Sequence, residues 1–245
     1  MTTPPTQAAA FDHGRFDAAL DAFVDARGRV DYAGLKRSGA LDPYLASLDA
    51  ATPEAMPPAE RLAFWINVYN AWTLRLILDH YPVRSIKRIT PARLPGLTLY
   101  LPKLNSPWEY RIVRAGGRRL TLNEVEHGIL RKTFGEPRIH FALVCAARSC
   151  PKLRREAFTG ARLDAQLDDQ ARDFLHDPAK NRIPDAPGLI RLSPIFRWFR
   201  RDFARDDRGL QAFLAPYFDG DVRNRLLRGA YRVRYLRYDW RLNEQ

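Results

Sequence analysis

The chain has 245 residues, an apolar fraction of 46% and a formal net charge of +12. A chain of this length buries a hydrophobic core without disulfide or metal staples, so the two cysteines need not be structural. The positive excess is mostly arginine and is spread along the whole chain. No helix-turn-helix, zinc-finger or RNA-binding motif accompanies it, which argues against nucleic acid as a partner.

The N-terminus and the apolar runs indicate where the protein works. Residues 1–10 have neither the basic region nor the apolar run of an export signal, so we predict a disordered leader and a cytoplasmic protein. The longest apolar run, residues 62–74, is interrupted by two asparagines and is shorter than the ~20 residues that cross a bilayer. We therefore expect no membrane span.

The first half of the chain is predicted to be helical. Apolar spacing predicts a helix over residues 16–24, which ends at a turn over residues 27–29, and a shorter amphipathic piece around residues 44–48. After a proline-rich loop, residues 59–80 are apolar almost all round. A helix of that kind belongs in the centre of a domain.

Two asparagines interrupt this apolar helix. Asn67 and Asn70 are three positions apart, so they lie on one side of it. A buried amide needs partners, because an unpaired one costs about 1–3 kcal/mol. Two interpretations stay open: the amides bind neighbouring backbone, or they point into an active cleft and orient a substrate or a catalytic imidazole.

Shorter elements follow in the second half. Gly116 and Gly117 predict the turn of a β-hairpin, and Thr121 and Glu124 stand in capping-box register at the start of a helix. We predict a helix over 121–131, a buried strand over 139–145, helices over 163–175 and 193–203, and a late strand over 231–238. The fold class is therefore α+β: one globular domain over residues 11–245, with the central apolar helix packed with a small mixed sheet and surrounding helices.

Residues 138–151 hold both cysteines of the chain, together with a histidine and two arginines. A bond between Cys145 and Cys150 would close a very short loop with little gain in chain entropy, so the two thiols resemble reactive groups more than a staple. At the end of the predicted strand, Cys145 would have backbone N–H groups near it that could receive an oxyanion. Arg148 would favour its thiolate.

A thiol nucleophile needs a base and a third group that fixes the base. In a regular strand His140 and Cys145 would point to opposite faces, so we predict His127 as the base of Cys145. The orienting group is Glu124, Glu126, Asn67 or Asn70. The residues predicted to bind substrate are Asn70, Arg138, His140, Arg148, Ser149 and Cys150.

This set predicts a thiol-dependent hydrolase or acyl/amide transferase that acts on a small molecule or a peptide without a cofactor. The first alternative is a non-catalytic binding module in which Arg138, Arg148 and the buried asparagines hold an anionic ligand. The second is a metal site built from Glu124, His127, His140 and the two cysteines, but the Cys-x4-Cys spacing fits structural zinc sites poorly and no second pair follows, so we predict no metal. Phosphate-binding loops and a serine-hydrolase elbow are absent from the sequence.

Six segments together resemble the DUF547 family, which has no assigned function. They are RVDYAGL (29–35), AFWINVYNA (63–71), YPVRSI (81–86), EHGILR (126–131), PRIHFALVCAARSCP (137–151) and LSPIFRWFRRDF (192–203). The resemblance covers residues 20–220 and implies a single domain without an internal boundary. In plant-type members the position matching Cys150 is more often serine while that matching Cys145 remains cysteine, which favours Cys145 as the nucleophile.

Overall fold

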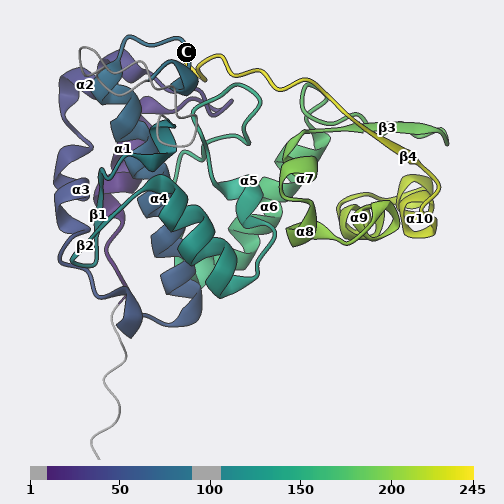
Figure 1. The fold of residues 1–245 in the computed structure, drawn as a ribbon, viewed down its shortest axis with the longest axis horizontal. Coiled ribbons are helices and arrows are strands. Elements are labelled where there is room, and N and C mark those ends of the chain that lie inside the picture. Colours follow the sequence, from purple (N-terminus) through teal and green to yellow (C-terminus); the bar gives the residue numbers. More distant parts are fainter. Residues whose placement is uncertain (1–9, 90–105) are drawn as a thin grey trace, which may run out of the picture.

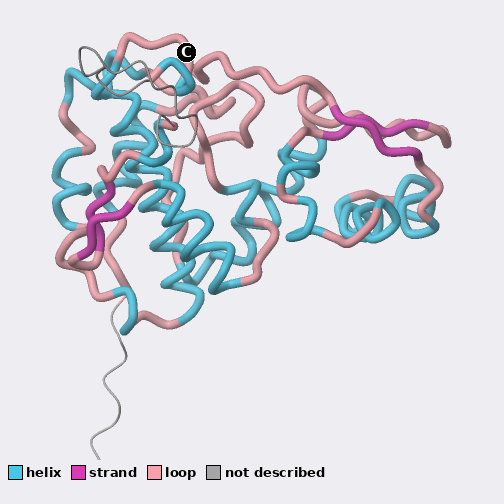
Figure 2. Tube along the Cα trace, viewed as in Figure 1, coloured by secondary structure: helices cyan, strands magenta, loops and turns pink. Residues whose placement is uncertain are grey.

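The computed structural model describes residues 10–89 and 106–245 (Figures 1 and 2). The predicted leader, apart from its last residue, lies outside the described residues. The longer helices are α1 (Gly14–Phe23), α2 (Tyr32–Ser38), α3 (Asp42–Ser47), α4 (Pro58–His80), α6 (Leu163–His176), α9 (Asp207–Leu214) and α10 (Gly220–Arg228). One-turn helices are α5 (Ile139–Ala142), α7 (Ile195–Trp198) and α8 (Arg200–Phe203), and η4 (Glu124–Phe134) is a π-helix.

Helix α4 is the centre of the first half of the molecule, as its sequence predicts. It begins with Pro58, which suits the first turn because its missing N–H has no partner there. Side chains on every side of it are buried, and α2, η4, α6 and the strand β1 pack around it (Figure 1). Neither α4 nor another helix within the described ranges is long and apolar enough to cross a membrane.

The strands form two separate sheets where a single mixed sheet was expected. Strands β1 (Val113–Ala115) and β2 (Arg118–Leu120) are the predicted antiparallel hairpin, and both turn glycines have positive φ, +60° and +65°. That geometry gives a turn whose twist matches the strands. Strands β3 (Leu189–Leu192) and β4 (Arg232–Tyr235) pair in parallel far from the hairpin (Figure 2).

The predicted strand over residues 139–145 is wrong. Residues Ile139–Ala142 form the helical turn α5, and the chain becomes extended only from Leu143. A short apolar run fits a buried helix as well as a buried strand, so its own pattern does not decide between them. Its burial is as expected, since residues 139–144 are all buried.

Side-chain amides decide this conformation by bonding to the backbone. Asn70 on α4 donates to the carbonyl of Ala142 (2.9 Å) and accepts from the N–H of Val144 (2.9 Å). Gln170 on α6 donates to the carbonyl of Phe141 (2.8 Å). These amides supply the partners that a neighbouring strand would supply in a sheet.

Asn67 does the same one turn earlier on α4. It donates to the carbonyl of Phe158 (2.7 Å) and accepts from the N–H of that residue (3.0 Å). Of the two interpretations of these asparagines, both amides therefore follow the first, because each uses its donor and its acceptor on neighbouring backbone.

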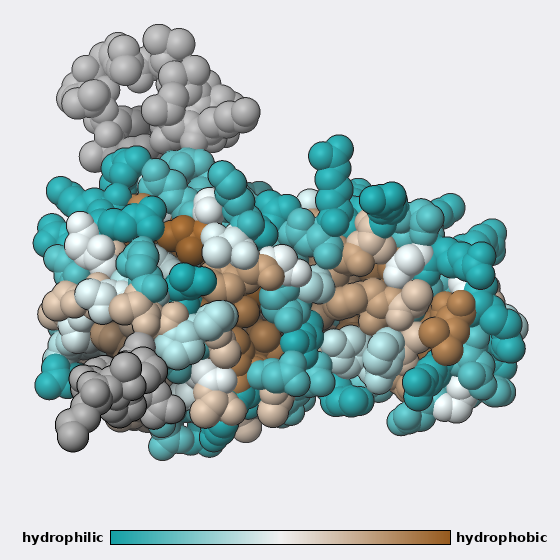
Figure 3. Space-filling view, turned by 90° about the horizontal axis from the view of Figure 1, so that it is seen from below, coloured by the Kyte–Doolittle hydropathy of each residue, from teal (hydrophilic) through white to brown (hydrophobic). Residues whose placement is uncertain are grey.

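Two apolar clusters form the core and meet at the middle of the molecule. The first surrounds α4, and the second gathers the aromatic side chains of α5 to α9, including Phe141, Phe174 and Phe196. Tyr238 packs against both clusters. On the face shown in Figure 3, apolar side chains gather towards the middle and hydrophilic ones surround them.

We expect Asn70→Ala to lower the free energy of unfolding by about 2–4 kcal/mol, because it leaves a buried carbonyl and a buried N–H without partners. Urea unfolding measures this. Asp79→Ala, which removes an exposed ion pair with Arg75 on the same helix, is the matched control and should cost less than about 1 kcal/mol. Equal losses in the two variants would contradict the role given to the amide.

Candidate active site

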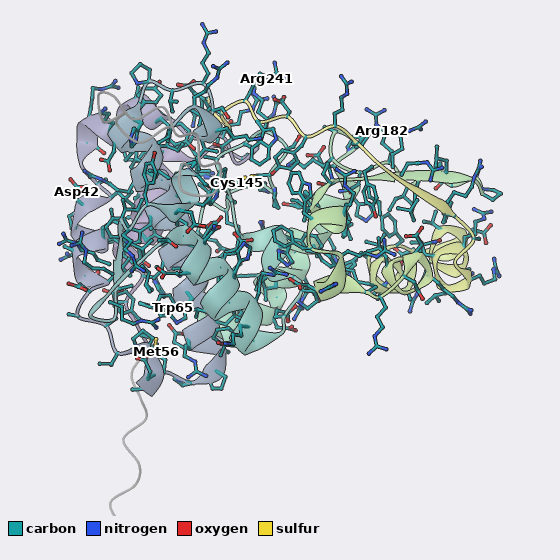
Figure 4. The ribbon with its side chains drawn as sticks, in the orientation of Figure 1. Asp42, Met56, Trp65, Cys145, Arg182 and Arg241 are labelled. Atoms are coloured by element: carbon teal, nitrogen blue, oxygen red, sulfur yellow. The ribbon has the colours of Figure 1, made fainter. Side chains whose placement is uncertain are left out.

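A cavity of about 460 Å³ lies between the two apolar clusters. The first half of the molecule contributes Tyr69, Trp108, Asn123, Glu126, His127 and Arg131 to its wall; α5 and the segment after it contribute His140, Leu143, Cys145, Cys150 and Pro151; and the second half contributes Ile195, Trp198, Phe199, Tyr238 and Trp240. We call it the thiol cavity. Cys145 lies at the middle of the molecule, below the C-terminal segment that carries Arg241 (Figure 4).

The two thiols are in direct contact in the wall of this cavity. The Sγ atoms of Cys145 and Cys150 are 2.6 Å apart, and Cys150 Sγ also accepts from the backbone N–H of Cys145 (3.1 Å). The hydroxyl of Tyr238 lies 3.1 Å from Cys150 Sγ and 3.5 Å from Cys145 Sγ. Cys150 is buried, whereas Cys145 is partly exposed.

These contacts shift the pKa values of the two thiols in opposite directions. Burial opposes ionisation of Cys150, but hydrogen bonds from Cys145, Tyr238 and backbone N–H groups outweigh it and lower its pKa to about 7. The contact with Cys150 and the removal of solvent from the sulfur raise the pKa of Cys145. Of the two thiols, Cys150 is therefore the one that loses its proton more readily.

Several N–H groups in and beside the loop after Cys145 bond within the protein, so they are not available to the oxyanion that the sequence suggested. The N–H of Cys145 bonds to Cys150 Sγ, and those of Arg148 and Ser149 bond to the carbonyls of Arg241 and Asp239. The N–H of Cys150 bonds to the carbonyl of Ala147. These donors stabilise the thiolate and the loop instead of facing a substrate.

Glu126 is the acidic group of the thiol cavity. It lies on η4 and is almost fully buried. Burial raises its pKa to about 7, against the hydrogen bond from Tyr69 and the charge of Arg131, which favour the ionised form. Its charge reaches Cys145, where it opposes ionisation of that thiol. A carboxyl with this pKa can donate or accept a proton near neutral pH.

His127 is held by a chain of hydrogen bonds from α8. Asp202 binds Arg131 through two bonds (2.6 and 2.9 Å), and Arg131 Nη1 lies 3.0 Å from Nδ1 of His127. Because arginine only donates, Nδ1 of His127 accepts and its proton sits on Nε2. Burial and the Arg131 charge lower the pKa of His127. Its assignment as the base of Cys145 stays a prediction.

His140 lies on the cavity wall with its Nε2 atom 2.7 Å from Asp202. Burial lowers its pKa to about 4, although Asp202 acts in the opposite direction. Burial also opposes the charge of Asp202, but the hydrogen bonds from Arg131 and His140 outweigh it and lower the pKa of this carboxyl. The expectation that His140 and Cys145 face apart is wrong, because α5 replaces the predicted strand and both line the cavity.

An aromatic wall lies opposite the polar groups. Trp240 stacks on Trp198 with ring centroids 5.7 Å apart, and Tyr238 lies 4.6 Å from Trp240 and 4.8 Å from Trp198. Trp108 meets Trp240 edge to face at 6.1 Å. Trp198 is 43% exposed although it is a large apolar side chain, so it offers open contact area at the cavity.

Several predicted site residues lie elsewhere. Glu124 caps η4 through the N–H of Thr121 and pairs with Arg111, and Asn67 is occupied by Phe158. Arg138 is bound by Glu136, Asp164 and Asp168 and has no free donor face for an anionic ligand. Arg148 and Ser149 line a different cavity on the far side of the cysteine loop.

The structure also brings to the thiol cavity, or into contact with its wall, residues that sequence reasoning missed: Tyr69, Arg131, Trp198, Asp202, Tyr238 and Trp240. Most come from segments distant from residues 138–151, and only their aromatic and charged character was visible. No group of three or more His, Cys, Asp or Glu side chains within the described ranges is placed to hold a metal ion.

The fold and the cavity define an α+β protein with a buried pair of free thiols facing an acid and an aromatic wall. The family profile described as "Protein of unknown function, DUF547" matches residues 53–175, which is half of the chain, and the protein belongs to this family. The match includes α4, η4, α5 and both cysteines. No curated protein and no solved structure matches the chain significantly.

We expect iodoacetamide to alkylate the native thiol pair with a midpoint near pH 7, because the pair loses its first proton there. The denatured chain, as internal control, should show the ordinary cysteine value of ~8.5. Cys150→Ser removes the thiol with the lowered pKa, so the remaining Cys145 thiol, whose pKa burial raises, should be alkylated with a midpoint above pH 7. A native midpoint at or above the denatured one would contradict the assigned coupling.

Glu126 should make the protein less stable as pH rises. Between its ordinary pKa of 4.5 and its folded value of about 7, the folded chain holds a proton that the unfolded chain has released. The free energy of unfolding contributed by this group therefore falls across that window, by roughly 2–4 kcal/mol. Glu126→Gln should remove this fall in urea titrations from pH 4 to 8, while Glu124→Gln on the same helix should keep it.

Proposed function

We propose that this protein is a thiol-dependent hydrolase or acyl/amide transferase in which Cys145 attacks the carbonyl group of a small-molecule or peptide substrate. The observation that carries the proposal is the contact of the partly exposed Cys145 thiol with Cys150, the thiol of lowered pKa, in a cavity that also holds the protonatable Glu126.

Proton transfer within the pair would activate the nucleophile. As Cys145 sulfur forms its bond to the carbonyl carbon, its proton passes to the neighbouring Cys150 sulfur. The electron pair of the C=O bond moves to the oxygen. A base with a pKa near the working pH suits this step, and Cys150 has a pKa of about 7.

Other groups in the cavity would stabilise the tetrahedral intermediate and protonate the leaving group. The Nε2–H group of neutral His127 is a donor for the oxyanion, and Arg131 fixes its orientation. As the carbon–heteroatom bond breaks, the Glu126 carboxyl gives its proton to the leaving group, and a thioester on Cys145 remains. Water or an acceptor amine then loses a proton to the Glu126 carboxylate and attacks the thioester, and Cys145 leaves as the thiol by taking back the proton from Cys150.

The cavity suggests the class of substrate. Its volume of about 460 Å³ is that of a small-molecule site. The aromatic wall of Trp108, Trp198, Tyr238 and Trp240 favours an apolar or planar acyl group, which would stack there with its carbonyl towards the thiol pair.

The test is an acylation assay with p-nitrophenyl esters of acetate and of a larger aromatic acid. We expect a burst of p-nitrophenolate and, in peptide mass spectra, an acyl group on Cys145, with the aromatic ester reacting faster. Cys145→Ser should abolish the burst. Glu126→Gln should slow turnover by about 10²-fold or more and Glu124→Gln should not, because only Glu126 lines the cavity.

Two outcomes would contradict this proposal. One is that no ester or thioester acylates the native protein while both thiols remain titratable. The other is acylation that is unchanged in Cys145→Ser.

The contact between the sulfurs also favours a second candidate, thiol–disulfide exchange with a small disulfide. One cysteine thiolate would attack the substrate disulfide and release a thiolate, and the second cysteine would then displace the other half and leave a Cys145–Cys150 disulfide. Incubation with an aliphatic disulfide should then release two thiols for each protein chain, and Cys150→Ser should stop at the mixed disulfide. Acyl transfer without this release would exclude the second candidate.

A further inference from the structure

A second cavity, of about 580 Å³, lies back to back with the thiol cavity. The C-terminal segment separates them, and its side chains alternate between the two. Tyr238 and Trp240 line the thiol cavity, whereas Arg237, Asp239 and Arg241 line the second cavity. One extended stretch of chain thus gives one cavity an aromatic wall and the other a charged wall. We call the second one the basic cavity.

The basic cavity carries a large excess of positive charge. Seven arginines and lysines line it against three aspartates. Each aspartate is already paired, with Lys152, Lys180 or Arg241. Four arginines remain that make no ion pair with a carboxylate in the described part of the chain: Arg27, Arg29, Arg148 and Arg237.

These four arginines differ from others in this basic protein because they line one cavity without a carboxylate partner in the described part of the chain. Arg138, for example, is neutralised by three carboxylates, and Arg154 by Glu156 and Asp169. In the basic cavity, like charges from three distant segments of the chain face one hollow, where they repel one another unless an anion lies between them.

Hydrogen bonds within the protein hold the backbone around Arg27 and Arg29 in place without a bound anion. The carboxylate of Asp25 accepts the N–H groups of Arg27 and Arg29, each at 2.8 Å. Gly28 between them has a φ of +72°, and a Cβ atom there would lie 2.7 Å from the backbone nitrogen of Leu153. The turn is therefore seated tightly against the loop after the cysteines.

The opposite wall is equally constrained. The N–H of Arg148 donates to the carbonyl of Arg241 (2.8 Å), and the N–H of Asp239 donates to the hydroxyl of Ser149 (2.8 Å). Binding an anion here requires only that exposed guanidinium groups turn inward, which keeps the ordering cost low.

We propose that the basic cavity binds a small anion that carries at least two phosphate groups. Guanidinium groups bind phosphate oxygens in pairs of parallel hydrogen bonds, and four of them match two phosphates. Among the described residues, Phe174 is the one aromatic side chain in the lining, and it is 1% exposed, so this part of the chain offers no open ring for stacking a nucleobase. Recognition therefore rests on charge, and the enclosed volume suits a compact anion better than a nucleic-acid strand.

The test is calorimetric titration of the full chain with sodium pyrophosphate, with sodium sulfate at matched ionic strength as the reference. We expect saturable binding of pyrophosphate that exceeds sulfate binding. Arg148→Gln with Arg237→Gln should weaken it about tenfold or more, because each substitution removes charge-assisted hydrogen bonds. Arg205→Gln with Arg223→Gln, two exposed arginines outside the cavity, make the same change in net charge and should leave affinity nearly unchanged.

Three results would overturn the proposal. They are no pyrophosphate binding beyond that of sulfate, equal weakening in the two double variants, and binding of a single-stranded oligonucleotide that pyrophosphate does not displace. Thermal unfolding of the double variants shows that they are folded. Cys145→Ser should bind pyrophosphate like the native chain, so this test and the acylation test fail independently.

Discussion

Side-chain amides that bond to backbone hold this structure together at the segment that leads into the thiol pair. Asn70 from α4 and Gln170 from α6 provide the partners of the backbone at Phe141, Ala142 and Val144, where a sheet would otherwise be needed. Because a buried peptide group without a partner costs free energy, the chain can leave its helical turn only where these amides meet it. That point sets the direction of His140 before it and of Cys145 after it.

The cysteine loop that follows directs backbone N–H groups into the protein. One of them, the N–H of Cys145, bonds to Cys150 Sγ and helps to lower the pKa of that thiol. Most loops at nucleophiles present N–H groups to a substrate, but this loop gives one to the sulfur of Cys150 and others to the C-terminal segment. Hydrogen bonds lower the pKa of the buried Cys150, whereas the pKa of the partly exposed Cys145 beside it is raised. Cys150 has the lowered pKa and Cys145 is the more accessible thiol, and the two sulfurs are in contact.

The C-terminal segment completes both cavities although it follows the cysteines by about ninety residues. Its alternation places Tyr238 and Trp240 on the thiol side and Arg237 and Arg241 on the basic side. An apolar substrate and a phosphorylated anion would thus bind on opposite faces of one strip of chain. The cysteine loop, which bonds to that strip through Arg148 and Ser149, lies between the two sites.

The sequence by itself determined the long central helix, the capping box at Thr121, the glycine hairpin and the family, because periodicity, caps and turn residues act between neighbours in the chain. It also predicted the cysteine segment as a site, and both cysteines line the thiol cavity. Only the tertiary structure decided that residues 139–142 are helical, since a short apolar run takes the conformation for which its neighbours supply hydrogen-bond partners. It likewise decided the charges of the site: Asp202 reaches His140 across 62 positions and Tyr238 reaches Cys150 across 88, and a pKa depends on such contacts and on burial, which no local pattern contains.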